Sequence, residues 1–463
     1  MANFIEKNIE RAGQWMAQQI AGYLQTPRER VFKVVQDYYT GDHPAQLRVK
    51  VGQDNDNVTM NFLGLAVDRA VSMLVGDGVE FVYPEEAEAA QEYINQVWNA
   101  NKRSIFLHDT ALDGAIFGTP FIKMIPDGIK DPYTDNTFPR IVLLDPKLMT
   151  VEVDPLDKSK VNQYIMQYKV TINGKERLYR EVTRRAQPDD FETPDIETKT
   201  WIVEEQEFIN SWVTLNVEQF PYDFPPIIHW KNLPSIHSVY GMSDIEQVIN
   251  VQDKYNFVQS NNLKINRYHA HPKTWGSGVT KTEKSSWGAD EMILISSPEG
   301  KINNLEMSSD LTASRAIALD LRQVLFDVAR QVDITSITDK IGALTNFGLS
   351  LLFSDSISKT NTKRALYGEA FSEINRRLLV MANIQVVPCE VRWGDALPIN
   401  IKEELEIDQL AIDLGIVDKQ TVSERYVKRY GQNWETIQER INEQKGQESN
   451  IGTILLNRFN QGQ

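Results

Sequence analysis

The side chains best suited to chemistry are carboxylates and amides grouped in one short polar segment. Asp54 and Asp56 alternate with Asn55 and Asn57, and such oxygens are the ligands that calcium and magnesium prefer. The glycine and the final glutamate of an EF-hand loop are missing from this segment. We therefore expect a polar loop.

A second candidate for metal binding is the histidine pair His269 and His271. Residues two apart share one face of a strand, as in some zinc sites. No cysteine lies near them, and the chain has six histidines in all. Cys389 is the only cysteine, which excludes an intramolecular disulfide and a cysteine-cluster zinc site. We expect no bound metal.

Signatures of nucleotide and acyl-transfer chemistry are missing from the sequence. It contains no G-x-x-x-x-G-K-[ST] phosphate loop and no G-x-S-x-G nucleophile elbow. Gly276-Ser277-Gly278 lacks the strand-to-helix context of a phosphate-binding turn, and Cys389 has no evident histidine partner. We predict a protein that is not an enzyme and needs no cofactor.

The distribution of acidic and basic residues along the chain is the next feature with a bearing on function. The formal net charge is −15; residues 1–235 hold 35 acidic against 24 basic residues, whereas 236–401 hold 18 against 17. Proteins that grip nucleic acid present a surplus of Lys and Arg to the phosphates. The absence of such a surplus argues against a tight nucleic-acid clamp but is compatible with a passage along which DNA slides. The acidity would also keep a large assembly soluble.

Helical periodicity dominates the first third of the chain. Apolar spacing and glycine stops predict helices at 4–24, 29–39, 62–75, 85–98 and 109–117. Alternating residues then predict an antiparallel sheet, with Asn173-Gly174 as a hairpin turn and strands at 141–144, 163–172, 200–207 and 212–218. No secretory signal or membrane-length apolar run is evident, so we expect synthesis in the cytoplasm.

Two long helices with an unusual connection follow the prolines at 221–234. They are predicted at 241–268 and 310–332, although neighbouring helices in a globular domain normally join through short loops. The second helix carries an apolar stripe of Ile317, Leu321, Val324, Leu325, Val328 and Val332. Its other faces carry the charged residues Arg315, Asp320, Arg322, Asp327 and Arg330.

The last part of the chain begins with a polar segment, 333–346, in which Lys340 is the only base. Another long helix is predicted at 347–384, a strand at 386–393 and a helical tail at 402–463. The chain is therefore predicted to be α+β, predominantly helical, and built of two to four structural units.

Five segments, taken in order, resemble a known family over nearly the whole chain. They are Tyr38–His43 (YYTGDH), Ala111–Met124 (ALDGAIFGTPFIKM) with Leu144-Asp145-Pro146, Pro225–Asn232 with Gly241–Glu246 (GMSDIE), the helix Val251–Ser260, and Gly348–Leu352 with Arg364, Leu397-Pro398 and the helical tail. Each is a weak signal alone. Their order and spacing resemble the portal proteins of long-tailed double-stranded-DNA bacteriophages.

The resemblance implies a phage portal fold, with wing, stem, clip and crown regions, that assembles into a ring around an axial channel. By position, residues 1–240 correspond to the wing, 241–268 and 310–332 to the two stem helices, and 269–309 to the clip. Residues 333–346 correspond to a tunnel loop, 347–401 to the long wing helix and its return strand, and 402–463 to a helical crown.

The resemblance also implies where the ring meets DNA and partner proteins. Repeated around a ring, Lys340 would form a belt of positive charge in a loop that contains Ser336, Thr338, Asp339 and Asn346. In the clip, the expected contact residues are Lys273, Trp275, Lys281, Lys284 and Trp287, and in the stem they are Arg315, Asp320, Arg322, Asp327 and Arg330. The alternatives are a solvated loop lysine, core tryptophans and an apolar stripe that is only internal core.

The implied function is that of a structural ring subunit at one capsid vertex, forming the channel for genome packaging and ejection. The implied partners are other copies of the chain (usually twelve in all), the terminase large subunit, the major capsid and scaffolding proteins, a head-completion or adaptor protein, and double-stranded DNA, but no membrane. The ring would form in the host cytoplasm and reside in the virion. Alternatives are a metal-dependent hydrolase or nuclease that uses acids such as Asp54, and another virion structural or adaptor protein.

Overall fold

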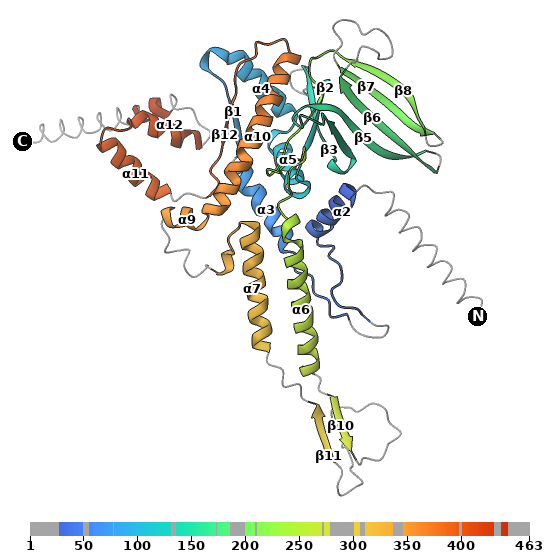
Figure 1. Cartoon of the computed structure of the whole chain (residues 1–463). Helices are drawn as coiled ribbons and strands as arrows, with labels where there is room; N and C mark the ends of the chain where they lie inside the picture. Colours follow the sequence, from blue (N-terminus) through green and yellow to red (C-terminus); the bar gives the residue numbers. More distant parts are fainter. Residues whose placement is uncertain are drawn as a thin grey trace, which may run out of the picture. The chain divides into compact units, whose positions relative to one another are not determined.

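The computed structural model (Figure 1) describes residues 27–49, 55–76, 78–130, 136–172, 174–185, 200–208, 211–270, 273–277, 301–305, 311–336, 346–397, 401–429 and 437–442. The chain divides into two units. One comprises Met1–Ala343 with Ser350–Leu397, and the other comprises Leu344–Leu349 with Pro398–Gln463. The predicted helix at 4–24 lies outside the described residues.

A helical core forms the centre of the larger unit. It contains α2 (Pro27–Thr40), α3 (Phe62–Val75), α4 (Glu88–Ala100), α5 (Arg103–Phe117) and α10 (Ser354–Met381). Trp98 is fully buried, and its ring packs against Phe81 and Phe371 at centroid distances of 5.0 and 6.2 Å. The helices predicted at 29–39, 62–75 and 85–98 are confirmed, whereas α5 begins six residues before the predicted Asp109.

Two antiparallel sheets lie beside this core. The three-stranded sheet has the order β3 (Thr137–Leu144), β2 (Phe121–Lys130), β9 (Ile227–His229). The five-stranded sheet has the order β4 (Met149–Val153), β5 (Val161–Ile172), β6 (Lys175–Arg185), β7 (Thr200–Phe208), β8 (Ser211–Phe220). The predicted hairpin is confirmed, because Ile172 pairs with Lys175 across the two-residue turn. The prediction of an α+β chain is confirmed as well.

A two-stranded ladder joins distant parts of the sequence. Strand β1 (Val79–Val82) pairs antiparallel with β12 (Glu390–Trp393), so that Val79 lies opposite Trp393. The sequence pattern did not predict β1, and it predicted too long a strand at 386–393. Only the four residues that find a partner in β1 make ladder hydrogen bonds, and β12 is accordingly short.

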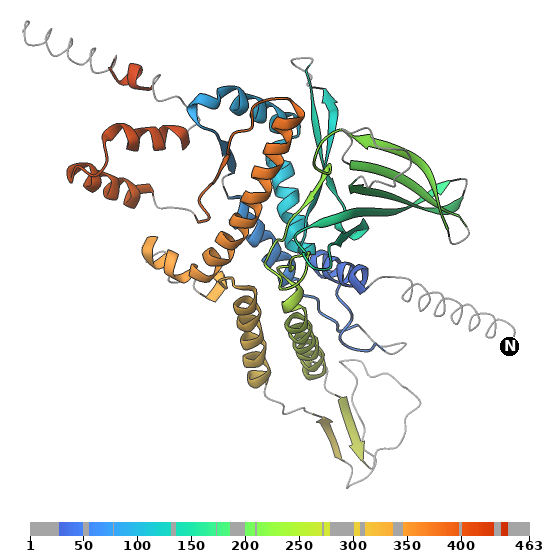
Figure 2. The same ribbon diagram turned by 45° about the horizontal axis from the view of Figure 1, so that its top comes forward.

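The two long helices, α6 (Ile249–Ala270) and α7 (Leu311–Ala329), lie side by side, and both views show them leaving the core together (Figures 1 and 2). Ser314 donates a hydrogen bond to the Asn262 side chain between them. In the connection, β10 (Lys273–Ser277) pairs antiparallel with β11 (Lys301–Leu305). The rest of this connection, residues 271–272, 278–300 and 306–310, lies outside the described residues.

The predicted boundaries of these helices need correction. The first helix begins with a 3-10 turn, Glu246–Val248, and not at Gly241, because the backbone of the preceding residues is hydrogen-bonded to other segments. Asp244 N–H, for example, donates to the carbonyl of Ala115 at 2.9 Å. The second helix ends at Ala329 instead of Val332, because Arg330 has a positive φ of 55°.

The single helix predicted at 347–384 is two helices. Helix α9 spans Asn346–Leu352 and α10 starts at Ser354, since Phe353 has a non-helical backbone (φ −92°, ψ 11°). Asp355 lies in the first turn of α10, where the partial positive charge of the helix N-terminus favours a carboxylate. Local sequence at this position therefore supports a new helix start.

In the smaller unit, α11 (Ile401–Asp413) and α12 (Lys419–Arg429) are joined through Gly415. Arg425 of α12 pairs with Asp408 of α11 at 3.1 Å. The helical tail predicted at 402–463 is thus confirmed over these two helices. Across the described part of the whole chain, no helix combines the length and apolar character needed to cross a membrane.

A backbone crossing holds the segment before α6 against the end of α5. Gly118, with φ of +79°, and Gly241 are so close that a Cβ on Gly241 would collide with the Gly118 carbonyl oxygen and lie 2.8 Å from Asn232 N. Both obstacles are main-chain atoms, which cannot rotate away. These two glycines permit the close approach.

Gly241→Ala is expected to destabilise the larger unit by about 2 kcal/mol, because the added methyl overpacks a backbone crossing. Thermal unfolding followed by circular dichroism measures the effect. The matched control is Gly368→Ala in α10, where the nearest atom to a new Cβ is 3.9 Å away; it should be neutral or stabilising by up to about 1 kcal/mol. Equal midpoints for the two variants would contradict the crossing as a constraint.

Candidate functional site

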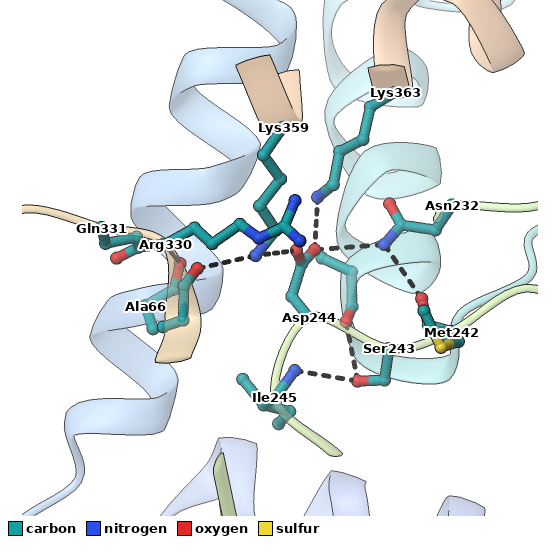
Figure 3. Close-up of polar contacts among 12 residues, drawn as sticks. Ala66, Asn232, Met242, Ser243, Asp244, Ile245, Arg330, Gln331, Lys359 and Lys363 are labelled. Atoms are coloured by element: carbon teal, nitrogen blue, oxygen red, sulfur yellow. Dashed lines mark hydrogen bonds and ion pairs between the residues drawn. The ribbon is translucent and has the colours of Figure 1, made fainter. Parts of the chain in front are cut away.

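A buried ionic cluster joins the long helix pair to the core (Figure 3). The Asp244 side chain, 1% exposed, lies between two lysines of α10. Lys359 Nζ is 2.7 Å from Asp244 Oδ1, and Lys363 Nζ contacts Oδ2. One carboxylate therefore pairs with two ammonium groups in the interior.

Neutral groups complete the cluster and extend it to α7. Asn232 Nδ2 donates to Asp244 Oδ2 at 3.2 Å, and Tyr367 O–H donates to Asn232 Oδ1 at 3.1 Å. Lys359 Nζ also donates to the carbonyl of Ala329, the last residue of α7, at 2.9 Å. Asp244, shortly before α6, and Ala329, the last residue of α7, are thus tied to neighbouring turns of α10.

The charge states of the cluster follow from burial and from the charges nearby. Burial by itself raises the pKa of Asp244, but Lys363 and Lys359 outweigh it and lower this pKa to about 2. Burial lowers the pKa of Lys363, against the attraction of Asp244. Burial raises the pKa of Tyr367 well above its usual value, so its hydroxyl stays neutral. The carboxylate is therefore ionised at physiological pH.

An extended strap, residues 42–49 and 55–60, is hydrogen-bonded along α6. Asn256 Oδ1 accepts from the backbone of Met60 at 3.1 Å, and Ser260 Oγ accepts from the backbone of Val58 at 3.0 Å. Arg267 pairs with Asp56 at 2.6 Å. The face of α6 that lies under the strap is consequently polar, formed by Gln252, Asn256 and Ser260.

One of the candidate cation ligands, Asp56, lies in the strap. Asp54 lies outside the described residues, and Asp56 forms the ion pair with Arg267. Within the described ranges, no three His, Cys, Asp or Glu side chains are grouped so that they could hold a metal ion.

Of the five charged residues predicted on the second long helix, one is paired within the chain and four have exposed side chains. Arg322 pairs within the chain with Asp333 at 2.9 Å and lies 5.1 Å from the centroid of the Phe62 ring. Arg330, with an exposed side chain, follows the end of α7, and its carbonyl accepts from Ser356 Oγ at 2.7 Å. The others, all exposed on α7, are Arg315, Asp320 and Asp327.

The apolar stripe of α7 is also divided. Leu325 is buried, whereas Ile317, Val324 and Val328 are 52%, 44% and 42% exposed. With 100° between successive helical residues, these three form one outward stripe, and Asp320 and Asp327 line its edge. The buried face consists of Ala318, Leu325, Phe326 and Ala329.

Helix α6 has a different outer face. Phe257 is 43% exposed and has the exposed Lys254 one turn before it. Helical geometry places this pair away from Tyr255 and Asn262, which face α7, and from the polar residues under the strap. The helix pair therefore presents an acidic-edged apolar stripe on α7 and a basic-edged phenylalanine on α6.

The remaining predicted contact residues are only partly described. Lys273 and Trp275 lie on β10, Ser336 ends the 3-10 turn Ile334–Ser336, and Asn346 begins α9. Outside the described residues are Lys281, Lys284, Trp287, Thr338, Asp339 and Lys340.

Sequence reasoning missed the ionic cluster, although signals for it existed. Asp244 falls in the segment GMSDIE that carries the family resemblance, and Lys359 and Lys363 are four residues apart, hence on one helical face. Their exposure cannot be read from that spacing, because lysines on a helix are usually solvated. Only the packing of α10 against residues 232–245 identifies them as buried.

The family model described as "Phage portal protein, SPP1 Gp6-like" matches residues 28–449, which is nearly the whole chain. No curated protein matches it.

Asp244→Asn is expected to lower the free energy of unfolding by about 3–5 kcal/mol, because two buried lysines lose their counter-charge. Chemical denaturation at neutral pH measures the loss. Glu390→Gln, which removes a carboxylate paired with Arg392 on the surface at 2.9 Å, is the matched control and should leave the midpoint almost unchanged. A wild-type-like Asp244→Asn protein would contradict the cluster's role.

Acid should act on the same carboxylate. The pKa of Asp244 is about 2 in the folded chain against 3.8 ordinarily, so its stabilisation is complete above the ordinary value and is lost as the pH falls toward 2. Over this window the wild type should lose more stability than Asp244→Asn. Denaturation curves collected between pH 5 and pH 2 test this, and parallel losses in both proteins would refute it.

Proposed function

Since the chain belongs to the SPP1 Gp6-like family of phage portal proteins, we propose a specific contact by which its copies assemble into the portal ring. The protein is a structural component of the phage capsid, serving genome packaging and the head-to-tail connection. Portal proteins of this family act as homo-oligomeric rings that interact with the capsid and the terminase.

The proposed contact joins the outer face of α7 to the outer face of α6 on the next copy. A cyclic ring requires heterologous contacts, in which one surface meets a different surface of the neighbour. Ile317, Val324 and Val328 offer exposed apolar area on α7, and Phe257 offers it on α6. Burial of these side chains would stabilise the ring in proportion to the area removed from water.

Charge complementarity supports this pairing. The Ser314–Asn262 hydrogen bond sets the two antiparallel helices in register. Lys254 comes eight residues before Asn262 and is level with Arg322, eight residues after Ser314. If the ring axis runs along the helices, Lys254 of a neighbour lies at the height between Asp320 and Asp327. A basic edge then faces an acidic one.

The ionic cluster provides the rigid base for this arrangement. Because Asp244, Lys359 and the carbonyl of Ala329 are linked, the two long helices leave the core from one fixed point. Identical subunits can close a ring only if each presents both faces in the same geometry.

The finer assignments follow the family resemblance. We propose the wing, clip, tunnel-loop and crown regions given above, with α6 and α7 as the two stem helices at their corrected bounds, a ring of twelve, and a portal vertex assembled in the host cytoplasm. The partners would be the terminase large subunit, then head-completion proteins, with capsid and scaffolding proteins around the ring. DNA would pass through without sequence preference, and the ring itself would catalyse no reaction.

Lys340 remains the proposed DNA contact of the tunnel loop. As the only base of 333–346, it would be repeated once per subunit around the channel. A single positive charge per subunit attracts phosphates without the many contacts that make binding tight and strongly salt-dependent.

Lys254→Glu is expected to raise the concentration at which rings form by about tenfold or more, since it places like charges together at the contact. The double variant Lys254→Glu/Asp320→Lys should restore assembly, because the pair is inverted. Negative-stain microscopy and analytical ultracentrifugation measure ring formation.

The matched control for this charge reversal is Lys160→Glu, an exposed lysine in the turn between β4 and β5. It should assemble like the wild type. Normal rings from Lys254→Glu, or failure of the double variant to recover, would reject this contact while leaving the family assignment intact.

Lys340→Ala should package DNA more slowly although its rings form normally, because the channel loses its belt of positive charge. Lys340→Arg keeps the charge and should package at the wild-type rate. An in vitro packaging assay with purified rings, motor and capsids supplies the measurement. Full packaging by Lys340→Ala would eliminate the proposed loop contact.

A further inference from the structure

Helix α11 of the smaller unit carries exposed apolar side chains on two opposite sides. The major stripe consists of Ile407, Leu410 and Leu414, which are between 59% and 65% exposed. The minor stripe consists of Ile401 and Leu405, each 48% exposed. With 100° between successive helical residues, the centres of the two stripes are about 170° apart around the helix.

Helix α12 packs on one of the polar sides between the stripes. Asp408 is buried and pairs with Arg425 of α12 at 3.1 Å, and Glu404, one turn earlier, lies 3.9 Å from the same guanidinium. These carboxylates lie on the side of α11 that separates the two stripes. The contact with α12 therefore leaves both stripes exposed.

The remaining side of α11 is charged, and its side chains satisfy one another. Lys402 Nζ is 3.8 Å from Glu406 Oε1, and Gln409 donates to Asp413 Oδ1 at 2.9 Å. All four side chains are exposed. This side is suited to remain in contact with water, in contrast to the two stripes.

The end of α11 holds the major stripe in a fixed line. The N–H of Leu414 donates to the carbonyl of Leu410 at 3.0 Å, so Leu414 continues the helical turn. Gly415 has a φ of +70°, and the N–H of Ile416 donates to the carbonyl of Ala411 at 2.9 Å. This is the usual glycine-terminated helix end, in which the last turn is hydrogen-bonded.

Apolar surface on opposite sides of a helix requires a partner on each side. A helix with a single partner needs one apolar stripe, and exposed apolar patches of this kind mark interaction sites. The two stripes differ in sequence, as a heterologous contact requires, since there one surface meets a different surface of the neighbour. A copy of the chain on each side satisfies both conditions, because every copy in a ring has two neighbours.

We propose that the α11 helices of neighbouring copies pack side by side as a belt, with the major stripe of one copy against the minor stripe of the next. Helix α12 would then lie along one face of the belt, and the charged side of α11 would form the other face. The proposal rests on the ring assembly of the family and not on the contact between α6 and α7. It gives each pair of subunits a second contact, located in a different compact unit of the chain.

Disulfide trapping in assembled rings of the full-length chain tests the belt. In a Cys389→Ser background, Leu405→Cys is combined in turn with Ile407→Cys, Leu410→Cys and Leu414→Cys, which covers three possible registers. The paired side chains point apart on one helix, so they cannot form a bond within a chain. At least one pair should give a ladder of covalent oligomers on a non-reducing gel.

Two controls make this ladder specific. Leu405→Cys/Asp413→Cys places the second thiol on the charged side and should give about tenfold less cross-linked product than the best stripe pair. Each single-cysteine variant should give no oligomers, because a heterologous contact never brings two copies of one residue together.

The gel pattern separates the outcomes. A ladder from a stripe pair alone supports the belt. Dimers from a single-cysteine variant would overturn it in favour of a two-fold contact, and an equal ladder from the Asp413 pair, or none from any stripe pair, would reject it. Since the rings are first verified by negative-stain microscopy, such a failure would leave the contact between α6 and α7 untouched.

A second measurement needs no added cysteine. Leu410→Ser should raise the concentration at which rings form by about tenfold, because a leucine buried between subunits is lost. The matched control is Leu156→Ser, which replaces a leucine that is 99% exposed in the turn between β4 and β5; it should assemble like the wild type. Equal assembly by both variants would count against the belt.

Discussion

The ion pairs of Asp244 are the interaction on which the rest of this structure depends. A lone ionised carboxylate in the interior is prohibitively costly, so Asp244 requires Lys359 and Lys363, and each lysine requires Asp244 in turn. Because Lys359 also binds the carbonyl at the end of α7, this mutual dependence fixes the two long helices to α10. Such pairs add orientation more than net stability, and a ring subunit needs defined orientation.

A second constraint is the inversion of polarity on α6. Its buried face satisfies the backbone of the strap with Asn256 and Ser260, while Phe257 stays partly exposed. In an isolated subunit this arrangement leaves apolar surface exposed to water while polar side chains are buried. In the proposed ring, where subunits would meet through these helices, hydrogen bonds would define the internal contact and leave the apolar side chains available for the external one.

The sequence predicted most local elements, because their signals are local. Helical periodicity located α2, α3 and α4, and Asn173-Gly174 located the β5–β6 hairpin. Boundaries failed where distant residues decide them. The start of α6 is displaced by hydrogen bonds from residues 232–244 to the end of α5, and β1 exists only because β12, far along the chain, pairs with it.

The sequence by itself determined the family, the mixed α+β composition and the pair of long helices, since each depends on residue order and periodicity. Tertiary structure alone decided which charges are structural and which are free. Arg322 and Asp320 are equivalent in the sequence pattern, yet one is paired inside the chain and the other is exposed. The same holds for Lys359, Lys363 and Asp244, because burial and partnership arise from segments that meet only when the chain has folded.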